Sequence, residues 1–281
     1  MIINLKIMKR LLFAALFFFL ITSCKKNNDD FPIALEEIKI DLSSHKLATY
    51  SKIDSTRYLV VFESGGGDGH SVWCNGNFLL EVSKRSDVLL YDRAGYENSE
   101  VGPTPRNIQQ LESELERVIN HFRGNRKVIL VGHSIGGFII RDYAIKNPDK
   151  TAAILFIDPS HESYNKLTQE QEDNLYELMK NEYGEHFGGT METRELKDDI
   201  DYASTLPNLP DVPVTILTSM KIEGNITASD KQLWYDAHED LRKGVTDFTH
   251  ISTTKSGHYI MVDEPDLVID QVELLISKLP K

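Results

Sequence analysis

Short apolar runs alternate with segments of helical period along most of the chain. The later runs, such as residues 128–131 (VILV), are apolar at every position, as expected for strands that are buried on both faces. This alternation predicts an α/β fold with a mostly parallel central sheet of about eight strands, flanked by helices. The predicted strands are Ile38–Leu42, Leu47–Ser51, Tyr58–Glu63, Val88–Tyr91, Lys127–Val131, Ala153–Ile157, Val214–Thr218 and Phe248–Thr253.

Two helices are marked by apolar residues at intervals of three and four. In the first, the apolar stripe runs from Ile108 to Phe122, and we expect Thr104 to cap the helix and Pro105 to occupy its first position. The second is the C-terminal helix, which is expected to follow Asp263 and to carry Pro265 near its start. Helices of this kind between strands support the α/β interpretation.

One long segment, residues 161–209, interrupts the alternation of strands and helices. It is polar and rich in charge, and it contains a helical patch at Gln171–Lys180. A segment of this length between two strands is either a disordered loop or an inserted lid. Because long connections in compact domains are usually functional, we favour a small helical lid.

The N-terminal residues have the pattern of a secretion signal. Basic residues at positions 6, 9 and 10 precede the apolar run Leu11–Ile21, which is too short to span a bilayer comfortably. Translation could start at Met1 or at Met8. No later stretch is long and apolar enough to cross a membrane.

The end of this apolar run, residues 21–24 (ITSC), resembles a bacterial lipobox. The resemblance implies cleavage before Cys24 and a lipid on its sulfur; the alternative is an ordinary secretory signal. We therefore expect a lipoprotein signal peptide over residues 1–24, a polar tether over 25–35 and a catalytic domain over 36–281. The protein would be anchored in a bacterial cell envelope through Cys24 alone.

Composition restricts the function further. The chain has 281 residues, of which 41% are hydrophobic, which suits one substantial domain. Its net charge of −12 argues against nucleic-acid binding, since no basic stripe exists to neutralise phosphates. Only Cys74 would remain beside Cys24, so no disulfide framework is expected.

The strongest chemical signal is residues 132–137 (GHSIGG), which follow a predicted strand and precede a helical pattern. In the pattern G-x-S-x-G, the serine lies on a sharp turn between a strand and a helix, where its hydroxyl is exposed. Gly132 and Gly136 remove side chains that would collide in this turn. Ser134 is therefore the candidate nucleophile, and the backbone N–H of Ile135 is a candidate oxyanion donor.

The chain resembles the α/β-hydrolase superfamily, in particular a branch that carries an Asp-Arg-x-Gly-Tyr segment. The resemblance covers nearly all of residues 36–281. Four segments carry it in the expected order: residues 63–67 (ESGGG), 92–96 (DRAGY), 132–137 (GHSIGG) and 256–258 (SGH).

This resemblance implies roles for further residues. Gly66 would supply the second oxyanion donor, and His258 would be the general base. The acid is ambiguous: Glu223 lies after the strand at 214–218, where the family usually keeps it, whereas Asp158 follows the strand at 153–157, as in some lipases. We favour Asp158. Arg93 is expected to organise loops beside the site through a pair with a carboxylate.

These expectations define a serine hydrolase that acts through an acyl-enzyme on Ser134, without a metal or cofactor. The expected substrate is a small-molecule carboxylic ester, and an amide is the less favoured alternative. Two alternatives stay open. One is other chemistry on the same fold, such as C–C hydrolysis or a perhydrolase reaction. The other is a catalytically idle, lipid-anchored binding protein. Epoxide hydrolysis is disfavoured because it needs a carboxylate at the position of Ser134.

Overall fold

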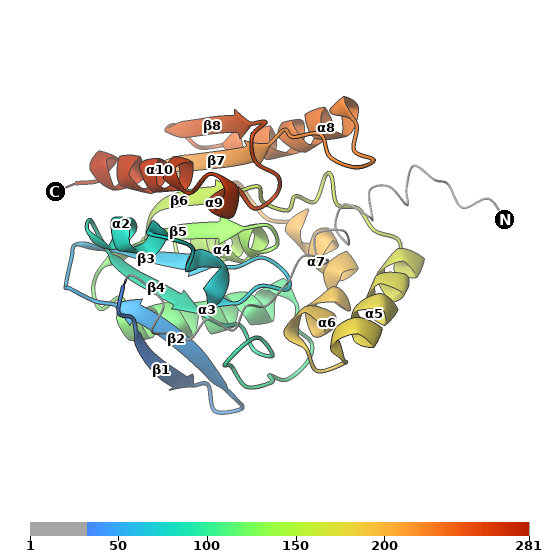
Figure 1. Cartoon of the computed structure of the whole chain (residues 1–281), viewed down its shortest axis with the longest axis horizontal. Coiled ribbons are helices and arrows are strands. Elements are labelled where there is room, and N and C mark those ends of the chain that lie inside the picture. Colours follow the sequence, from blue (N-terminus) through green and yellow to red (C-terminus); the bar gives the residue numbers. More distant parts are fainter. Residues whose placement is uncertain (1–32, 281) are drawn as a thin grey trace.

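The protein is built on a single sheet of eight strands, seen in a computed structural model that describes residues 33–280 (Figure 1). Their spatial order is β1-β2-β4-β3-β5-β6-β7-β8. β2 is antiparallel to both of its neighbours, and all other pairs are parallel. All eight predicted strands are confirmed: β1 (Glu36–Asp41), β2 (Lys46–Lys52), β3 (Tyr58–Glu63), β4 (Asp87–Tyr91), β5 (Lys127–His133), β6 (Thr151–Ile157), β7 (Val214–Ser219) and β8 (Phe248–Thr253).

Helices connect the strands and cover the sheet. Short 3₁₀ turns occur at His70–Trp73 and Asp240–Arg242. The α-helices are α2 (Phe78–Ser83), α3 (Ile108–Phe122), α4 (Gly136–Lys146), α5 (Gln169–Tyr183), α6 (Gly188–Thr193), α7 (Leu196–Ala203), α8 (Ala228–Glu239), α9 (Ile260–Asp263) and α10 (Pro265–Lys278).

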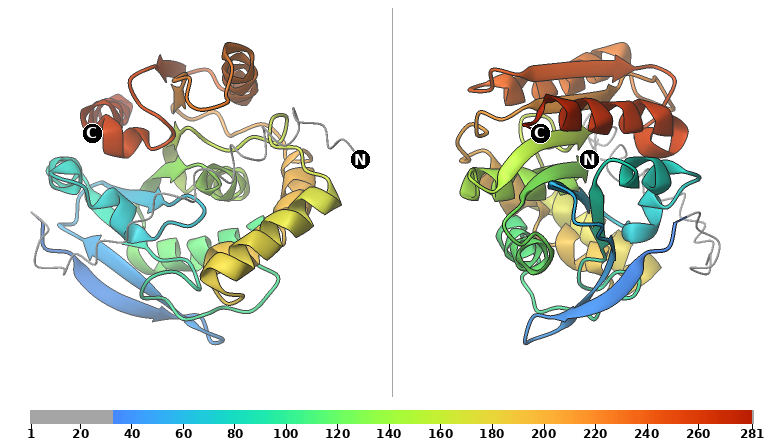
Figure 2. Two further views of the ribbon diagram at one scale, coloured as in Figure 1. Left: turned by 45° about the vertical axis from the view of Figure 1, so that its right-hand side comes forward. Right: turned by 90° about the vertical axis from the view of Figure 1, so that its left-hand side faces the viewer.

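The sheet is buried on both faces, which explains the uninterrupted apolar runs in its strands. Along β3, Val60 and Phe62 pack with residues of α2 and α10, whereas Leu59 and Val61 pack with residues of α3 and α4. Figure 2 shows α2 and α10 on one side of the sheet and α3 and α4 on the other. The fold is therefore the three-layer α/β arrangement that the sequence predicts.

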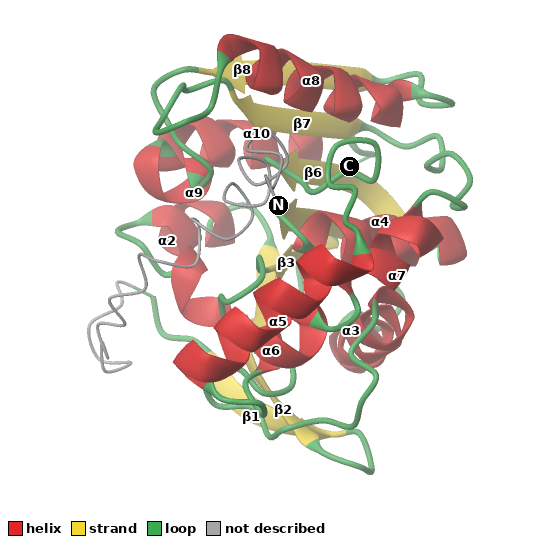
Figure 3. Cartoon of the chain, turned by 90° about the vertical axis from the view of Figure 1, so that its right-hand side faces the viewer, coloured by secondary structure: helices red, strands yellow, loops and turns green. Residues whose placement is uncertain are grey.

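The long segment between β6 and β7 is folded and contains α5, α6 and α7. These helices lie together at one end of the sheet, in front of the strands in the view of Figure 3. α5 begins with a capping box, in which Thr168 and Gln171 bond each other's backbone N–H groups. We call residues 161–209 the insertion.

The start of α3 differs from the sequence prediction. Thr104 and Pro105 lie before the helix and are joined by a cis peptide bond. The cap is Asn107, whose side chain accepts a hydrogen bond from the backbone N–H of Gln110 at 3.0 Å. The prediction of Thr104 as the cap was wrong. It relied on the preference of proline for the first helical position, whereas Asn107 is an equally good cap and lies directly before the apolar stripe. Pro265 does occupy the first turn of α10, as expected.

The N-terminal predictions fall mostly outside the described residues. The signal peptide over 1–24, with Cys24, lies wholly outside them and stays a prediction. The end of the expected tether does not: Ile33 is buried, and Leu35 packs against the same apolar cluster. Close packing thus begins by Ile33 rather than at residue 36. Within the described residues, Cys74 is buried and unpaired, and no helix has the length and apolar character to cross a membrane.

The position of the α3 cap can be tested by stability. Asn107→Ala should lower the free energy of unfolding by about 1 kcal/mol, because it removes an acceptor for an N–H group of the first turn. Thr104→Ala should change it by less than about 0.5 kcal/mol. Urea unfolding followed by circular dichroism measures both variants. A larger loss in Thr104→Ala than in Asn107→Ala would contradict this assignment.

Candidate active site

Ser134 lies on the tight turn between β5 and α4 and has a positive φ of 54°. This left-handed conformation is uncommon for a residue with a side chain and marks local strain that the surrounding structure must hold. The turn is fixed to the neighbouring strand, since the N–H of Ser134 donates to the carbonyl of Ile157 at 3.2 Å. The Ser134 hydroxyl lines a cavity at this end of the sheet.

The glycines of the turn are required by close packing. A Cβ on Gly136 would lie 2.6 Å from the carbonyl oxygen of Ser64, and one on Gly132 would lie 2.6 Å from the Cδ1 atom of Ile140. The first clash is with backbone, which cannot move away cheaply. Gly136 therefore lets the turn of Ser134 approach the loop that follows β3.

His258 and Asp158 form a buried pair. His258 lies between β8 and α9, and Asp158 directly follows β6, next to the strand that precedes Ser134. The Nδ1 atom of His258 lies 2.7 Å from the Oδ2 atom of Asp158. An N–H at Nδ1 donates to the carboxylate, so the tautomer with a basic Nε2 is favoured in the neutral ring.

The carboxylate of Asp158 is held on its other oxygen as well. Oδ1 accepts from the backbone N–H of Ser219 at 2.9 Å and from the indole N–H of Trp234 at 2.7 Å. Complete burial alone would raise the pKa of Asp158, but the hydrogen bond and charge of His258 and the nearby Lys231 lower it to about 2. Asp158 is therefore ionised at neutral pH.

The alternative acid, Glu223, lies on the surface. Its side chain is 46% exposed and forms an ion pair with Lys221 at 2.6 Å. Of the two candidates from the sequence, the structure places Asp158 against the imidazole of His258.

Both candidate oxyanion residues border the cavity that Ser134 lines. Gly66, in the loop after β3, and Ile135, directly after Ser134, line the same cavity as Ser134 and His258. Ile135 also precedes the first residue of α4, so its amide is at the positive end of the helix.

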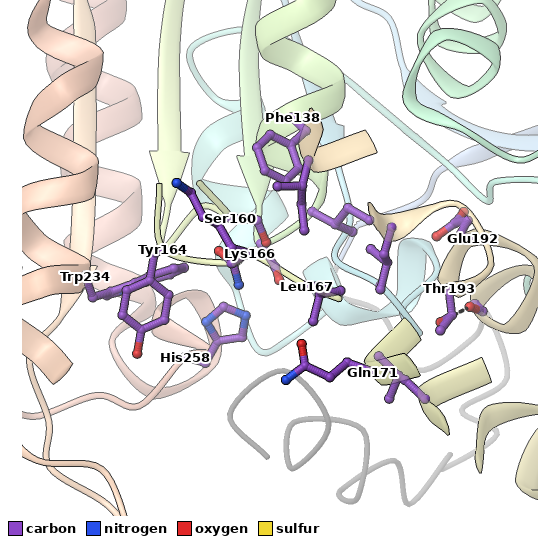
Figure 4. A pocket seen from close by; sticks show the side chains of 18 of the residues that line it. Phe138, Ser160, Tyr164, Lys166, Leu167, Gln171, Glu192, Thr193, Trp234 and His258 are labelled. Atoms are coloured by element: carbon purple, nitrogen blue, oxygen red, sulfur yellow. Dashed lines mark hydrogen bonds between the residues drawn. The ribbon is translucent and has the colours of Figure 1, made fainter. Parts of the chain in front are cut away.

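The cavity has a volume of about 350 Å³, and the insertion lines it with both aliphatic and polar side chains. Figure 4 shows His258 and Trp234 on one side and Glu192 and Thr193 on the other, with Phe138 of α4 above them. The aliphatic part of the wall consists of Ile135, Leu167, Leu175, Leu196 and Ile200. Most of these side chains come from the insertion, so the insertion shapes the space beside Ser134.

Comparisons with known proteins agree with this architecture. The family model described as alpha/beta hydrolase fold matches residues 58–195. A thermophilic esterase from Thermogutta terrifontis superimposes with a TM-score of 0.69 at 15% identity, over 86% of this chain and 98% of that one. The epoxide hydrolase CorEH superimposes with a TM-score of 0.67 at 15% identity, over 86% and 99%. This chain is an α/β-hydrolase-fold protein.

Among curated proteins, this α/β-hydrolase-fold chain is similar to the human (lyso)-N-acylphosphatidylethanolamine lipase. The two are 31% identical over 114 residues, which are 40% of this chain and 33% of that protein. The match to the bovine lipase is 32% identical over 38% of this chain and 31% of that protein. The chain thus spans about a third of the length of these curated relatives.

Arg93 is a buried residue that holds the glycine loop. Its Nη1 donates to the carboxylate of Glu63 at 2.8 Å and to the carbonyl of Ser64 at 2.7 Å, and its Nη2 donates to the carbonyl of Gly65 at 2.8 Å. Burial raises the pKa of Glu63 to about 7, even though Arg93 and the Tyr91 hydroxyl favour its charged form. The expected Arg–carboxylate pair is present, and it contacts the backbone on the N-terminal side of Gly66.

Asp92, the other half of that motif, forms a separate cluster with His70 and Glu97. These residues are of types that bind metals, and their ligand atoms lie within 4.8 Å of one another. However, the Nδ1 atom of His70 is 2.8 Å from both carboxylates. Burial alone would lower the pKa of His70, but hydrogen bonds to Asp92 and Glu97 raise it to about 9. The imidazolium thus supplies the positive charge that this cluster needs.

His133 supports the backbone at His258. Its Nε2 donates to the carbonyl of His258 at 3.1 Å, and the two rings are 4.5 Å apart between centroids. Burial and the neighbouring His258 hold the pKa of His133 well below its usual range, so the ring is neutral.

Two contacts to this site could not be predicted from the sequence. Trp234 of α8 donates to Asp158, and Glu192 of α6 bonds to Arg93. Neither residue lies in a motif, and both belong to segments whose packing depends on the complete fold. A tryptophan in a helical pattern, or one acidic residue among many, carries no distinguishing signal by itself.

The environment of Asp158 predicts a pH-dependent contribution to stability. Its pKa of about 2 in the folded state is below the usual value of about 3.9, so the contribution is present above pH 4 and is lost as the pH falls towards 2. Asp158→Asn should therefore cost about 2 kcal/mol more at pH 6 than at pH 2.5. Urea unfolding at both pH values measures this difference.

Asp270→Asn is the matched control, because Asp270 lies exposed on α10. Its effect on unfolding free energy should be small and nearly equal at the two pH values. An equal cost of Asp158→Asn at both values would refute the depressed pKa.

Proposed function

We propose that the protein hydrolyses carboxylic esters through an acyl-enzyme on Ser134. The observation that carries this proposal is the arrangement of one cavity, which is lined by Ser134, His258, Gly66 and Ile135. Asp158 does not line the cavity, but its carboxylate is hydrogen-bonded to His258. Nucleophile, base and oxyanion donors would thus surround one position for a reacting carbonyl.

The reaction follows from these positions. His258 takes the proton of Ser134 at Nε2 while the Ser134 oxygen bonds to the ester carbonyl carbon. The amides of Gly66 and Ile135 stabilise the resulting oxyanion. Its collapse breaks the bond to the alcohol, which leaves with the proton from His258. Water, deprotonated by His258, then attacks the acyl-enzyme and releases the carboxylic acid and Ser134.

Asp158 contributes without reacting itself. Its negative charge stabilises the imidazolium that forms on His258, and its hydrogen bond fixes the orientation of the ring. The hydrogen bonds from Ser219 and Trp234 keep this carboxylate in place and ionised.

The cavity supports an ester with an apolar acyl chain. Its volume of about 350 Å³ exceeds the needs of an acetyl group, and four aliphatic residues of the insertion, Leu167, Leu175, Leu196 and Ile200, line it. The esterase and lipase among the similar proteins are consistent with ester chemistry. Epoxide hydrolysis is not proposed, since Ser134 occupies the position where that chemistry needs a carboxylate.

Turnover of p-nitrophenyl butyrate by the full-length chain in detergent tests the mechanism. Ser134→Ala should abolish turnover and labelling by a fluorophosphonate. Asp158→Asn should reduce kcat by about a thousandfold or more, because the imidazolium loses its partner. Glu223→Gln should retain wild-type kcat. A wild-type protein without turnover and without labelling would refute the proposal, and full activity in Asp158→Asn with loss in Glu223→Gln would reassign the acid.

The acyl site can be tested with two substitutions on one helix. Leu175 of α5 lines the cavity, whereas Leu178 on the same helix is 45% exposed. Leu175→Trp should fill part of the cavity and lower kcat/KM for the octanoate ester by about tenfold or more relative to the acetate ester. Leu178→Trp should leave this ratio unchanged. Equal ratios in both variants would mean that the acyl chain lies elsewhere.

A further inference from the structure

We propose that Glu192 of the insertion is a positioning residue for the oxyanion site: it fixes the loop around Gly66 through Arg93 and Tyr96. This inference rests on the proposed function, because the role of Gly66 as an oxyanion donor belongs to it. The insertion would then contribute to the chemical step as well as to the shape of the cavity.

Both carboxylate oxygens of Glu192 accept hydrogen bonds from the core of the protein. Oε1 accepts from Nε of Arg93 at 2.8 Å, and Oε2 accepts from Nη2 of Arg93 at 3.1 Å and from the hydroxyl of Tyr96 at 2.7 Å. The side chains of Arg93, Tyr96 and Glu192 are all buried. The two partners of Glu192 are the residues that hold the glycine loop.

Arg93 and Tyr96 contact the loop on opposite sides of Gly66. Arg93 donates to the carbonyls of Ser64 and Gly65, which precede it. The Tyr96 hydroxyl accepts from the N–H of Gly67, which follows it, at 3.2 Å. Because this hydroxyl gives its own proton to Glu192, its lone pairs face Gly67.

Glu192 completes the hydrogen bonding of Arg93. The guanidinium has five N–H donors, and they are used by Glu63, Ser64, Gly65 and, for two of them, Glu192. Without the carboxylate, two buried N–H donors of Arg93 would have no acceptor, and half of the compensating charge would be lost. The guanidinium could then rotate, and the carbonyls beside Gly66 would move with it.

Direct backbone contact fixes the position of α6. The N–H of Gly188 donates to the carbonyl of Gly95 at 3.0 Å. A Cβ on Gly95 would lie 2.7 Å from the Gly188 nitrogen, and a Cβ on Gly188 would overlap the ring of Tyr96. Glu192 lies one helical turn after Gly188. The backbone contact therefore restricts where the Glu192 carboxylate can lie relative to Arg93.

Glu192→Gln tests the proposal because it keeps the size of the side chain. The amide offers one oxygen where three donors must be accepted, so the loop should shift and the Gly66 amide should lose its alignment. We expect kcat for p-nitrophenyl butyrate to fall by about tenfold to a hundredfold, with KM changed by less than about twofold. The inhibition constant of a phenylboronic acid should rise by a similar factor, since its adduct with Ser134 places an oxygen in the oxyanion site.

Glu114→Gln is the matched control. Glu114 is a buried carboxylate that receives the guanidinium of Arg106, with 2.7 Å from Nη2 to Oε2, and the same pair loses its charge in this variant. It should lower Tm as much as Glu192→Gln does and leave kcat unchanged at a temperature where both variants are folded. Tyr96→Phe is a second test, which keeps the ion pair and removes only the hydroxyl between Glu192 and Gly67; it too should lower kcat without raising KM.

The outcomes separate the inference from the proposed function. Wild-type kcat in both Glu192→Gln and Tyr96→Phe, or a loss confined to KM, would overturn the positioning role while Ser134-dependent turnover upholds the hydrolase. If Glu192→Gln does not fold, Tyr96→Phe decides alone. If the wild type shows no turnover that depends on Ser134, the hydrolase proposal and this inference both fail.

Discussion

A guanidinium group that is buried away from water needs both compensating charge and an acceptor for each N–H, and Arg93 imposes this requirement on the centre of the molecule. Its acceptors come from the end of β3, from the glycine loop and from α6. Segments far apart in sequence are therefore held around one cation. The loop beside Ser134, which is neither helix nor strand, is held in part by its hydrogen bonds to this cation.

The sheet supplies the complementary constraint. Parallel strands end at one edge, so the residues that follow β3, β5, β6 and β8 are brought together without any local signal between them. Because Gly132 and Gly136 have no Cβ, the turn of Ser134 can lie close to this edge. The strain at Ser134 is thus held by packing that also stabilises the core.

The eight strands, the main helices and the candidates Ser134 and His258 could be predicted from the sequence, because apolar period and short motifs are local signals. The choice between Asp158 and Glu223 was left open there, because distance to His258 depends on the complete sheet. The cap at Asn107 was missed because Thr104 and Pro105 offered the same local chemistry. Trp234 and Glu192 act through contacts between distant segments, for which a single sequence provides no pattern.

The contact between Gly95 and Gly188 has a consequence for how this protein can be recombined. Surface insertions are commonly treated as exchangeable modules that can be traded between relatives to alter selectivity. Here the first turn of α6 lies against the main chain of the core, and the carboxylate one turn later neutralises a core cation. A graft of residues 161–209 from another protein would need both the small residue and the acid at matching positions. Part of the insertion therefore belongs structurally to the core, and a clean exchange would have to leave α6 in place.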